Sequence, residues 1–366
     1  METHEHFMRM ALKQAERAWG DTAPNPMVGA VVVKGSEVLA TGYHHRDGLD
    51  HAEIDCLRKL NFKAQDCDMY VTLEPCTTHG RTGACSEAIK RAGIKRVFIG
   101  CKDINPAHAG RAEKIFNEAN IFCKFGILEK ECSELNFIFN KNITTNKALL
   151  AIKYAITKDG KIAEHSGAPS AITCEKSREN VMHWRKLFSA VGVGWGTVVA
   201  DNPSLTVRIA GDEKPPKARL IFDASLRSAD VDVSQYKLFS DEFKTSTHIV
   251  CDSSADMKKQ EVLLSKGIDV MRINASKNST EFWNELKSKL YQQKICSVYI
   301  EGGAGVYKSL CEAKAVDYVF EYVADKIFGC GLSAFGKEYF TINAVQSTYI
   351  CQDKFTRGYP IWTQKQ

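Results

Sequence analysis

Two short stretches of the sequence decide how the first half of the chain folds and what it binds. They are His51-Ala52-Glu53 and Thr72-Leu73-Glu74-Pro75-Cys76-Thr77-Thr78-His79-Gly80-Arg81-Thr82-Gly83-Ala84-Cys85. One imidazole and two thiolates make three ligands for Zn2+ and leave the fourth position to water, as in catalytic zinc sites. Zinc lowers the pKa of such a water and makes it a nucleophile near neutral pH. The sequence therefore predicts a zinc site at His51, Cys76 and Cys85. A helix opening at His51 would bring Glu53 into the same pocket as the general acid and base.

The order of these residues points to a deaminase. H-x-E followed by P-C is the signature of zinc deaminases, although their usual spacer is shorter. Here eight residues separate Cys76 from Cys85. This long spacer resembles the bifunctional riboflavin-biosynthesis deaminase/reductase family, whose motif runs H-A-E, then T-L-E-P-C-x-x-x-G-[RK]-T-x-x-C. Residues 72–76, 80–82 and 85 match it. The alternative, ordinary buried thiols and a surface histidine, explains this order poorly.

Length and composition set the broad class. The 366 residues favour two domains, and the polar stretch 140–147 predicts a boundary between residues 1–145 and 146–366. A formal charge of +5 suggests anionic small molecules rather than nucleic acid. The 13 cysteines have no disulfide-framework spacing, and neither a signal-peptide pattern nor a bilayer-length apolar run is present. We expect a cytoplasmic enzyme that binds neither nucleic acid nor a membrane.

Hydrophobic periodicity in the first half predicts alternating strands and helices. The expected helices cover 7–19, 51–60 and 85–92, with two more within 110–140, and the expected strands cover 27–33, 38–43, 68–73 and 97–101. This order is that of a cytidine-deaminase-like α/β/α layer.

The resemblance also implies substrate contacts in the first half. The turn Pro24-Asn25-Pro26 would place Asn25 against the pyrimidine, and His44 matches a pocket histidine. A proline-rigidified entry to a hairpin is the plainer explanation of that turn. Where the family has C-S-H, this chain has Cys76-Thr77-Thr78 with His79 next. The family histidine that contacts the phosphoribosyl group is therefore either missing here or replaced by His79.

The second half resembles the family's reductase domain, which is similar to dihydrofolate reductase in fold. Strands are expected over 149–157, 190–194, 219–223, 247–251, 297–302, 317–324 and 328–335, with an edge strand over 349–355 and a helix over 282–290. The strand ending at Glu301 runs into Gly302-Gly303-Ala304-Gly305, a turn that lets a phosphate approach the backbone at a helix N-terminus. The resemblance makes this turn the pyrophosphate loop for NADPH.

Residue roles in this half follow from the resemblance alone. Expected at the cofactor are Ala155, Ala171, Thr197, Asp201, Gly303, Ala304, Gly305, Val306, Tyr307, Lys308 and Ser309. Expected at the substrate are Lys153, Pro169, Arg185, Asn202, Leu205, Arg208 and Glu301. Arg185 would hold the substrate phosphate, because a guanidinium gives two parallel charge-assisted bonds. Pro169 and Ala171 stand where the family has a serine and a tryptophan.

The predicted function is therefore a bifunctional enzyme with Zn2+ and NADPH. As the family implies, it deaminates 2,5-diamino-6-ribosylamino-4(3H)-pyrimidinone 5′-phosphate. It then reduces the ribosyl group of 5-amino-6-(5-phosphoribosylamino)uracil, working as a homo-oligomer (a dimer or tetramer).

Three alternatives remain at this stage. A polynucleotide deaminase would need a basic, aromatic-lined surface and no second domain. A structural zinc module would need a fourth protein ligand. A deaminase with a lapsed reductase is suggested by Pro169 and Ala171.

Overall fold

The computed structural model describes residues 4–78, 83–106, 109–164, 172–209, 216–333 and 338–363. The chain divides into two compact units, Met1–Asn146 and Lys147–Gln366. Within the described residues, no helix combines the length and the apolar character needed to cross a bilayer.

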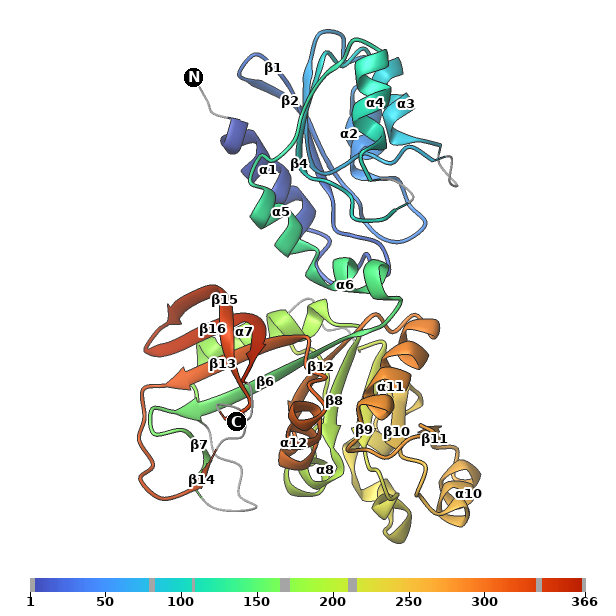
Figure 1. Cartoon of the computed structure of the whole chain (residues 1–366), viewed down its shortest axis with the longest axis vertical. Coiled ribbons are helices and arrows are strands. Elements are labelled where there is room, and N and C mark those ends of the chain that lie inside the picture. The colour runs from blue at the N-terminus through green and yellow to red at the C-terminus, as the bar shows by residue number, and fades with distance from the viewer. Residues whose placement is uncertain are drawn as a thin grey trace. The chain divides into compact units, whose positions relative to one another are not determined.

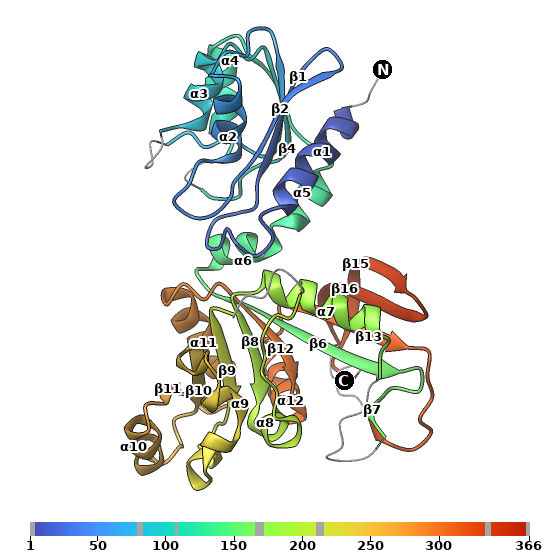
Figure 2. The ribbon, with the colours of Figure 1, turned by 180° about the vertical axis from the view of Figure 1, so that it is seen from behind.

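The first unit is an α/β/α layer built on one mixed sheet. Its elements are α1 (His4–Glu16), β1 (Gly29–Lys34), β2 (Glu37–Tyr43), α2 (Ala52–Lys59), β3 (Asp68–Leu73), α3 (Cys85–Arg91), β4 (Arg96–Cys101), α4 (Arg111–Glu118), β5 (Phe122–Lys124), α5 (Glu129–Leu135) and α6 (Phe137–Thr145). The strand order is β2-β1-β3-β4-β5. β1 runs antiparallel to both of its neighbours, and β3, β4 and β5 are parallel. Helices α1 and α5 lie on one face, and α2, α3 and α4 lie on the other (Figures 1 and 2).

Burial on both faces explains why the central strands are apolar. Every residue of β3 is buried, and so are the first five residues of β1. Helices on both faces of the sheet leave these central strands no solvent face, so a continuous apolar run replaces alternation. The segment 110–140 differs from the prediction, because a third helix, α6, begins at Phe137 directly after α5.

The second unit contains a nine-stranded sheet and a separate two-stranded one. Its elements are β6 (Leu149–Thr157), β7 (Lys161–Ala163), α7 (Glu175–Leu187), β8 (Ala190–Gly194), α8 (Trp195–Asp201), β9 (Ala218–Phe222), the 3-10 helices η1 (Arg227–Asp230), η2 (Val233–Gln235) and η3 (Lys244–Ser246), α9 (Lys237–Ser240), β10 (Thr247–Cys251), α10 (Met257–Ser265), β11 (Asp269–Arg272), α11 (Thr280–Gln292), β12 (Ser297–Gly302), α12 (Ala304–Glu312), β13 (Tyr318–Ala324), β14 (Leu332–Ser333), β15 (Phe340–Ile350) and β16 (Asp353–Trp362). The large sheet has the order β11-β10-β9-β8-β12-β6-β13-β16-β15.

Two hydrophobic clusters sandwich this sheet. Residues of α11 and α12 pack with Leu220 and Val250 on one side, whereas residues of α8, α9 and α10 pack with Ile221 and Cys251 on the other. Neighbours in sequence enter opposite clusters because side chains alternate across a strand. The first seven strands in this sheet order, β11, β10, β9, β8, β12, β6 and β13, are parallel to one another. Their carboxyl ends therefore meet along one edge of the sheet.

The C-terminal part of the prediction was wrong in two places. The expected edge strand over 349–355 is instead the turn of a hairpin, because β15 ends at Ile350 and β16 begins at Asp353. The true edge is β15. Of the expected strand over 328–335, the described residues 328–333 form only β14, which pairs with β7 outside the large sheet, and residues 334 and 335 lie outside the described part of the chain. Helix α7 and strand β11 were not predicted at all.

Candidate functional site

The three predicted metal ligands come together although they lie on separate elements. His51 caps the N-terminus of α2, Cys76 follows β3, and Cys85 begins α3. The His51 Nδ1 atom lies 3.6 Å from the Cys76 Sγ and 3.3 Å from the Cys85 Sγ. All three ligand atoms lie within 4.8 Å of one another. Tetrahedral zinc separates nitrogen and sulfur ligands by about 3.5 Å, given bonds of about 2.0 and 2.3 Å. The donor set and its spacing therefore fit zinc.

Hydrogen bonds prepare Cys76 as a thiolate. The Cys85 backbone N–H donates to the Cys76 Sγ over 3.3 Å. The hydrogen bond from the Cys85 thiol, assisted by His51, lowers the pKa of Cys76 to about 4. Since the thiolate is the ligand form of cysteine, this ligand is ready for a cation without further ionisation.

Glu53 lies in the same cavity but is not a member of the ligand cluster of His51, Cys76 and Cys85. Its side chain is 3% exposed, and burial raises its pKa to about 7. The cavity measures roughly 170 Å³ and contains His51, Glu53 and Cys76 among its walls. A carboxyl group poised near neutral pH can both accept and donate a proton. Its placement suits the predicted acid/base role.

Asn25 and His44 form one hydrogen-bonded unit in the wall of that cavity. The His44 ring nitrogens lie 2.9 Å from the Asp50 carbonyl (Nδ1) and 3.2 Å from the Asn25 Nδ2 (Nε2). Asn25 Nδ2 also donates to Asp47 Oδ1 over 3.2 Å. Burial lowers the pKa of His44, which favours a neutral ring that accepts from Asn25. With its amino group engaged, Asn25 presents its amide oxygen as an acceptor.

Glu74 was not predicted as a site residue, although it stands inside the T-L-E-P-C motif. Its carboxylate accepts three backbone N–H groups: Asp103 at 3.2 Å, Gly110 at 3.0 Å and Ala112 at 3.1 Å. Asp103 and Asn105 line the cavity beside Glu74. Glu74 therefore fixes one wall of the cavity rather than offering a free carboxylate to a ligand.

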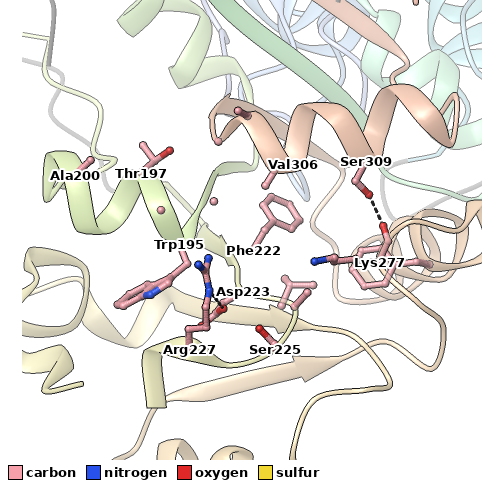
Figure 3. A pocket seen from close by; sticks show the side chains of 18 of the residues that line it. Trp195, Thr197, Ala200, Phe222, Asp223, Ser225, Arg227, Lys277, Val306 and Ser309 are labelled. Atoms are coloured by element: carbon pink, nitrogen blue, oxygen red, sulfur yellow. Dashed lines mark hydrogen bonds and ion pairs between the residues drawn. The ribbon is translucent and has the colours of Figure 1, made fainter. Parts of the chain in front are cut away.

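A second and larger cavity, of roughly 550 Å³, opens at the carboxyl ends of β8, β9, β10 and β12 (Figure 3). In open α/β sheets, this edge is where nucleotides bind. Seven of the predicted cofactor residues line it: Thr197, Asp201, Gly303, Ala304, Gly305, Val306 and Ser309.

One glycine of this cavity, Gly303, is required by the backbone. Gly303 has φ +105°, and a Cβ there would lie 3.0 Å from the Gly194 nitrogen. A Cβ on Gly305 would instead enter open space at the start of α12. A bound pyrophosphate fits this arrangement, because the first N–H groups of a helix have no partner within the helix. The cavity thus fits a nicotinamide dinucleotide.

Three other predicted cofactor residues are not among the described residues that line this cavity. Ala155 is half-buried in β6. The Tyr307 hydroxyl donates to backbone carbonyls, with Ile300 at 3.3 Å and Lys153 also in contact. Lys308 is exposed and lies 3.9 Å from Glu312. His79, Pro169 and Ala171 lie outside the described residues.

The predicted substrate residues Lys153, Arg185 and Glu301 form a charged cluster. Arg185 donates from Nε and Nη2 to the two carboxylate oxygens of Glu301, each over 2.7 Å, and from Nη1 to the Thr206 carbonyl over 2.5 Å. The side chains of Arg185 and Glu301 are 7% and 12% exposed. Burial lowers the pKa of Lys153, with Glu301 opposing that effect. Arg185 is thus committed to protein acceptors, which its sequence context did not suggest.

The segment from Asn202 to Arg208 is held by contacts within the protein. The Asn202 side chain accepts from the Lys237 N–H over 2.8 Å and donates to the Gln235 carbonyl over 3.3 Å. Leu205, at φ +53°, buries its side chain in the core. Arg208 is exposed and donates to the Ser204 hydroxyl over 3.1 Å.

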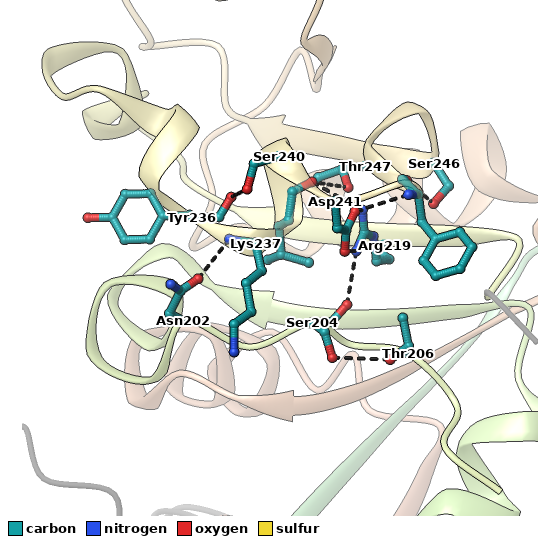
Figure 4. Close-up of polar contacts among 12 residues, drawn as sticks. Asn202, Ser204, Thr206, Arg219, Tyr236, Lys237, Ser240, Asp241, Ser246 and Thr247 are labelled. Atoms are coloured by element: carbon teal, nitrogen blue, oxygen red, sulfur yellow. Dashed lines mark hydrogen bonds and ion pairs between the residues drawn. The ribbon is translucent and has the colours of Figure 1, made fainter. Parts of the chain in front are cut away.

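Arg219 anchors this segment through the Ser204 carbonyl (Figure 4). It is fully buried on β9 and donates to both carboxylate oxygens of Asp241, over 2.6 and 2.7 Å. It also donates to the Ser204 carbonyl over 3.0 Å and the Leu238 carbonyl over 3.1 Å. Sequence reasoning missed it because an arginine inside an apolar strand gives no sign of its distant partner.

Comparison with known proteins decides the family. Residues 148–354 match the model of the RibD C-terminal domain, and residues 1–101 match the zinc-binding region of cytidine and deoxycytidylate deaminases. The riboflavin biosynthesis protein RibD of Actinobacillus pleuropneumoniae is 38% identical over 88% of this chain and 84% of its own length. The chain belongs to the RibD family. RibD of Aquifex aeolicus is 37% identical over 91% and 90% of the two chains.

Solved RibD structures agree over nearly the whole chain. RibD of Acinetobacter baumannii gives a TM-score of 0.80 at 29% identity, covering 98% of each chain. A Thermotoga maritima protein described as a diaminohydroxyphosphoribosylaminopyrimidine deaminase/5-amino-6-(5-phosphoribosylamino)uracil reductase gives 0.80 at 31% identity, with the same coverage. These findings confirm the predicted fold class, a cytidine-deaminase-like region followed by a dihydrofolate-reductase-like one. They also confirm a bifunctional RibD deaminase/reductase of riboflavin biosynthesis with zinc and NADPH as cofactors.

Proposed function

We propose that residues 1–145 deaminate 2,5-diamino-6-ribosylamino-4(3H)-pyrimidinone 5′-phosphate, and that residues 146–366 reduce the resulting 5-amino-6-(5-phosphoribosylamino)uracil with NADPH. The observation that carries the first activity is the meeting of His51, Cys76 and Cys85 beside a buried carboxyl group. The relatives' printed names supply the substrate class.

In the deaminase site, His51, Cys76 and Cys85 would hold zinc, which when bound would activate a water for attack on the carbon bearing the amine. Glu53 would take a proton from the attacking water and pass it to the amino group, which would leave as ammonia. Asn25 accepts a hydrogen bond from the pyrimidine through its amide oxygen, and His44 fixes the orientation of that amide. His79 is retained as a contact to the phosphoribosyl group.

In the reductase site, the cavity at the carboxyl ends of the strands would hold NADPH, with Thr197, Asp201, residues 303–306 and Ser309 at the cofactor. Tyr307 and Lys308 are proposed as cofactor contacts from the motif alone. Ala155 and Ala171 stay on the cofactor side. Lys153, Glu301 and Arg185 form the floor of the substrate site, where Arg185 positions Glu301 and the Thr206 backbone. Placing the two reactants in contact contributes on the order of 7–11 kcal/mol to such a reaction.

The segment beside this floor completes the substrate site. Asn202 and Leu205 shape its backbone. Arg208, whose exposed guanidinium also donates to the Ser204 hydroxyl, is the cation proposed for the phosphate. Pro169 is proposed as a further substrate contact because it stands at a substrate-binding position of the family motif.

We also place the enzyme in the cytoplasm as a homo-oligomer, a dimer or tetramer. All thirteen cysteines are free thiols, as expected in a reducing compartment. The edge strand β15 exposes Val345 and Tyr349, and an open strand edge readily pairs with another chain. Light scattering at working concentration measures the oligomeric state, and a monomer would contradict this part of the proposal.

Glu53→Gln tests the deaminase assignment. The variant keeps the three metal ligands, so zinc content should equal that of the unsubstituted enzyme. It cannot relay a proton, so deamination should fall by about 10²-fold or more. Retained turnover would remove Glu53 from the mechanism. Lost zinc would show that the residue is structural.

A further inference from the structure

The two ends of the reductase cavity differ in what they offer a dinucleotide. This inference rests on the NADPH site proposed above. Lys153 lies on β6 and Glu301 on β12, so the substrate floor is on the β12–β6 side of the sheet. The cavity runs the other way, past β8 to Phe222 at the end of β9 and Val250 of β10. A nicotinamide ring that meets the substrate therefore leaves the adenosine end near β9 and β10.

Two cationic side chains line that adenosine end. Arg227 and Lys277 come from different segments and both reach toward the cavity (Figure 3). The Arg227 side chain is 64% exposed, and its closest acidic neighbour is Asp223, with Nε and Oδ1 3.7 Å apart. Within the described residues, the Lys277 ammonium has no ion pair. Its backbone is fixed, because the N–H donates to Asp252 over 3.2 Å and the carbonyl accepts from the Ser309 hydroxyl.

Asp223 lines the same end of the cavity, directly after β9. In Rossmann-type sites an acidic residue near the adenosine ribose binds the 2′-hydroxyl of NAD, whereas a nearby arginine accommodates the 2′-phosphate of NADP. Asp223 is 1% exposed, and its Oδ2 accepts from the Ser228 N–H over 2.7 Å. Its Oδ1 has no hydrogen bond among the described residues. The guanidinium of Arg227 lies beside this buried carboxylate and offsets its charge.

We propose that Arg227 and Lys277 bind the ribose 2′-phosphate of NADPH and are the residues that make the reductase select NADPH over NADH. A guanidinium and an ammonium from opposite walls can each give a charge-assisted hydrogen bond to one phosphate. NADH lacks that phosphate, so neither side chain contributes to its binding.

The test is direct binding of each cofactor to the full-length chain. Arg227→Gln and Lys277→Gln are compared with Lys258→Gln, an exposed lysine of α10 outside the cavity, by titration calorimetry with NADPH and with NADH. One lost charge-assisted bond should raise the Kd for NADPH roughly tenfold or more. The loss should be larger for Arg227→Gln, because the Asp223 carboxylate then faces the phosphate uncompensated. The Kd for NADH should change less than about twofold in either variant, and Lys258→Gln should match the unsubstituted enzyme.

Each other outcome has a definite meaning. Equal losses for NADPH and NADH, with a lowered melting temperature, would make the two residues structural and overturn the proposal. Unchanged selectivity in both variants would overturn it as well, and so would an unsubstituted enzyme that binds the two cofactors equally. An unsubstituted enzyme that binds neither cofactor would instead refute the reductase assignment itself.

Discussion

Glu74→Gln should loosen one wall of the deaminase cavity while leaving the metal site intact. In the native chain, Oε2 of Glu74 accepts from the Asp103 and Gly110 N–H groups, and Oε1 accepts from the Ala112 N–H. A glutamine has only one oxygen. If that oxygen takes the place of Oε2 and accepts from Asp103 and Gly110, the amino group of the glutamine faces the Ala112 N–H.

The magnitude follows from this count of acceptors. One buried N–H loses its partner, which costs about 1–3 kcal/mol, and the other two bonds lose the strength that a charged acceptor gives. We expect the free energy of unfolding of the first unit to fall by about 2–4 kcal/mol. If about 1.4 kcal/mol of this reaches the bound state through Asp103 and Asn105, the KM for deamination rises roughly tenfold.

The assay combines urea unfolding, zinc content and deaminase kinetics. Glu87→Gln is the matched control, since Glu87 lies on α3 in the same unit and its side chain is 40% exposed. The control should change neither stability nor KM. Unchanged stability and unchanged kinetics in Glu74→Gln would show that the Glu74 carboxylate does not fix the cavity wall. A loss of zinc would show that Glu74 acts on the metal site.

Three further predictions concern both sites. Removing zinc with a chelator should abolish deamination but leave reduction of the deaminated substrate unchanged, because all three ligands lie in the first unit; a parallel loss of reduction would contradict this. Asn25→Asp should raise the KM for deamination about tenfold, since it replaces the amide that donates to His44 and Asp47; an unchanged KM would remove Asn25 from the site. Arg219→Met should lower the free energy of unfolding by about 3–5 kcal/mol in urea titrations, because Asp241 loses its partner, whereas a loss below about 1 kcal/mol would make the pair a surface-like one.

The deaminase cavity could be anticipated from sequence because its chemistry is local. Each of His51, Cys76 and Cys85 stands at the junction of a predicted strand or helix. The H-A-E and P-C motifs alone predicted that the three ligands meet, and in the mixed sheet these junctions do lie together. Glu53 followed from its two-residue offset on the same helix.

The reductase site was less accessible because its contacts join distant segments. The Arg185–Glu301 pair spans 116 positions, and Arg219 and Asp241 are 22 apart across a region without clear periodicity. A motif identifies such an arginine but does not show which acidic residue it pairs with. Asn202 shows the same limit, because its amide is used by the backbone at Gln235 and Lys237.

The C-terminal hairpin was not predicted for a different reason. β15 is exposed along most of its length, so it lacks the buried alternation that identifies a half-buried strand. It nevertheless pairs with β16 from Phe340 to Ile350, and no apolar pattern in the sequence indicates this pairing.

The most direct test of the central claim, that one chain performs both steps, is to incubate the enzyme with the diaminopyrimidine ribosyl phosphate with and without NADPH and to identify the products by mass. Without NADPH, the product should carry oxygen in place of one NH and nothing else. With NADPH, the same product should gain two hydrogens, and one NADPH should be oxidised for each ammonia released. Deamination without any reduction at saturating NADPH would contradict a working reductase. Oxidation of NADPH by the substrate before deamination would contradict the proposed order of the two steps.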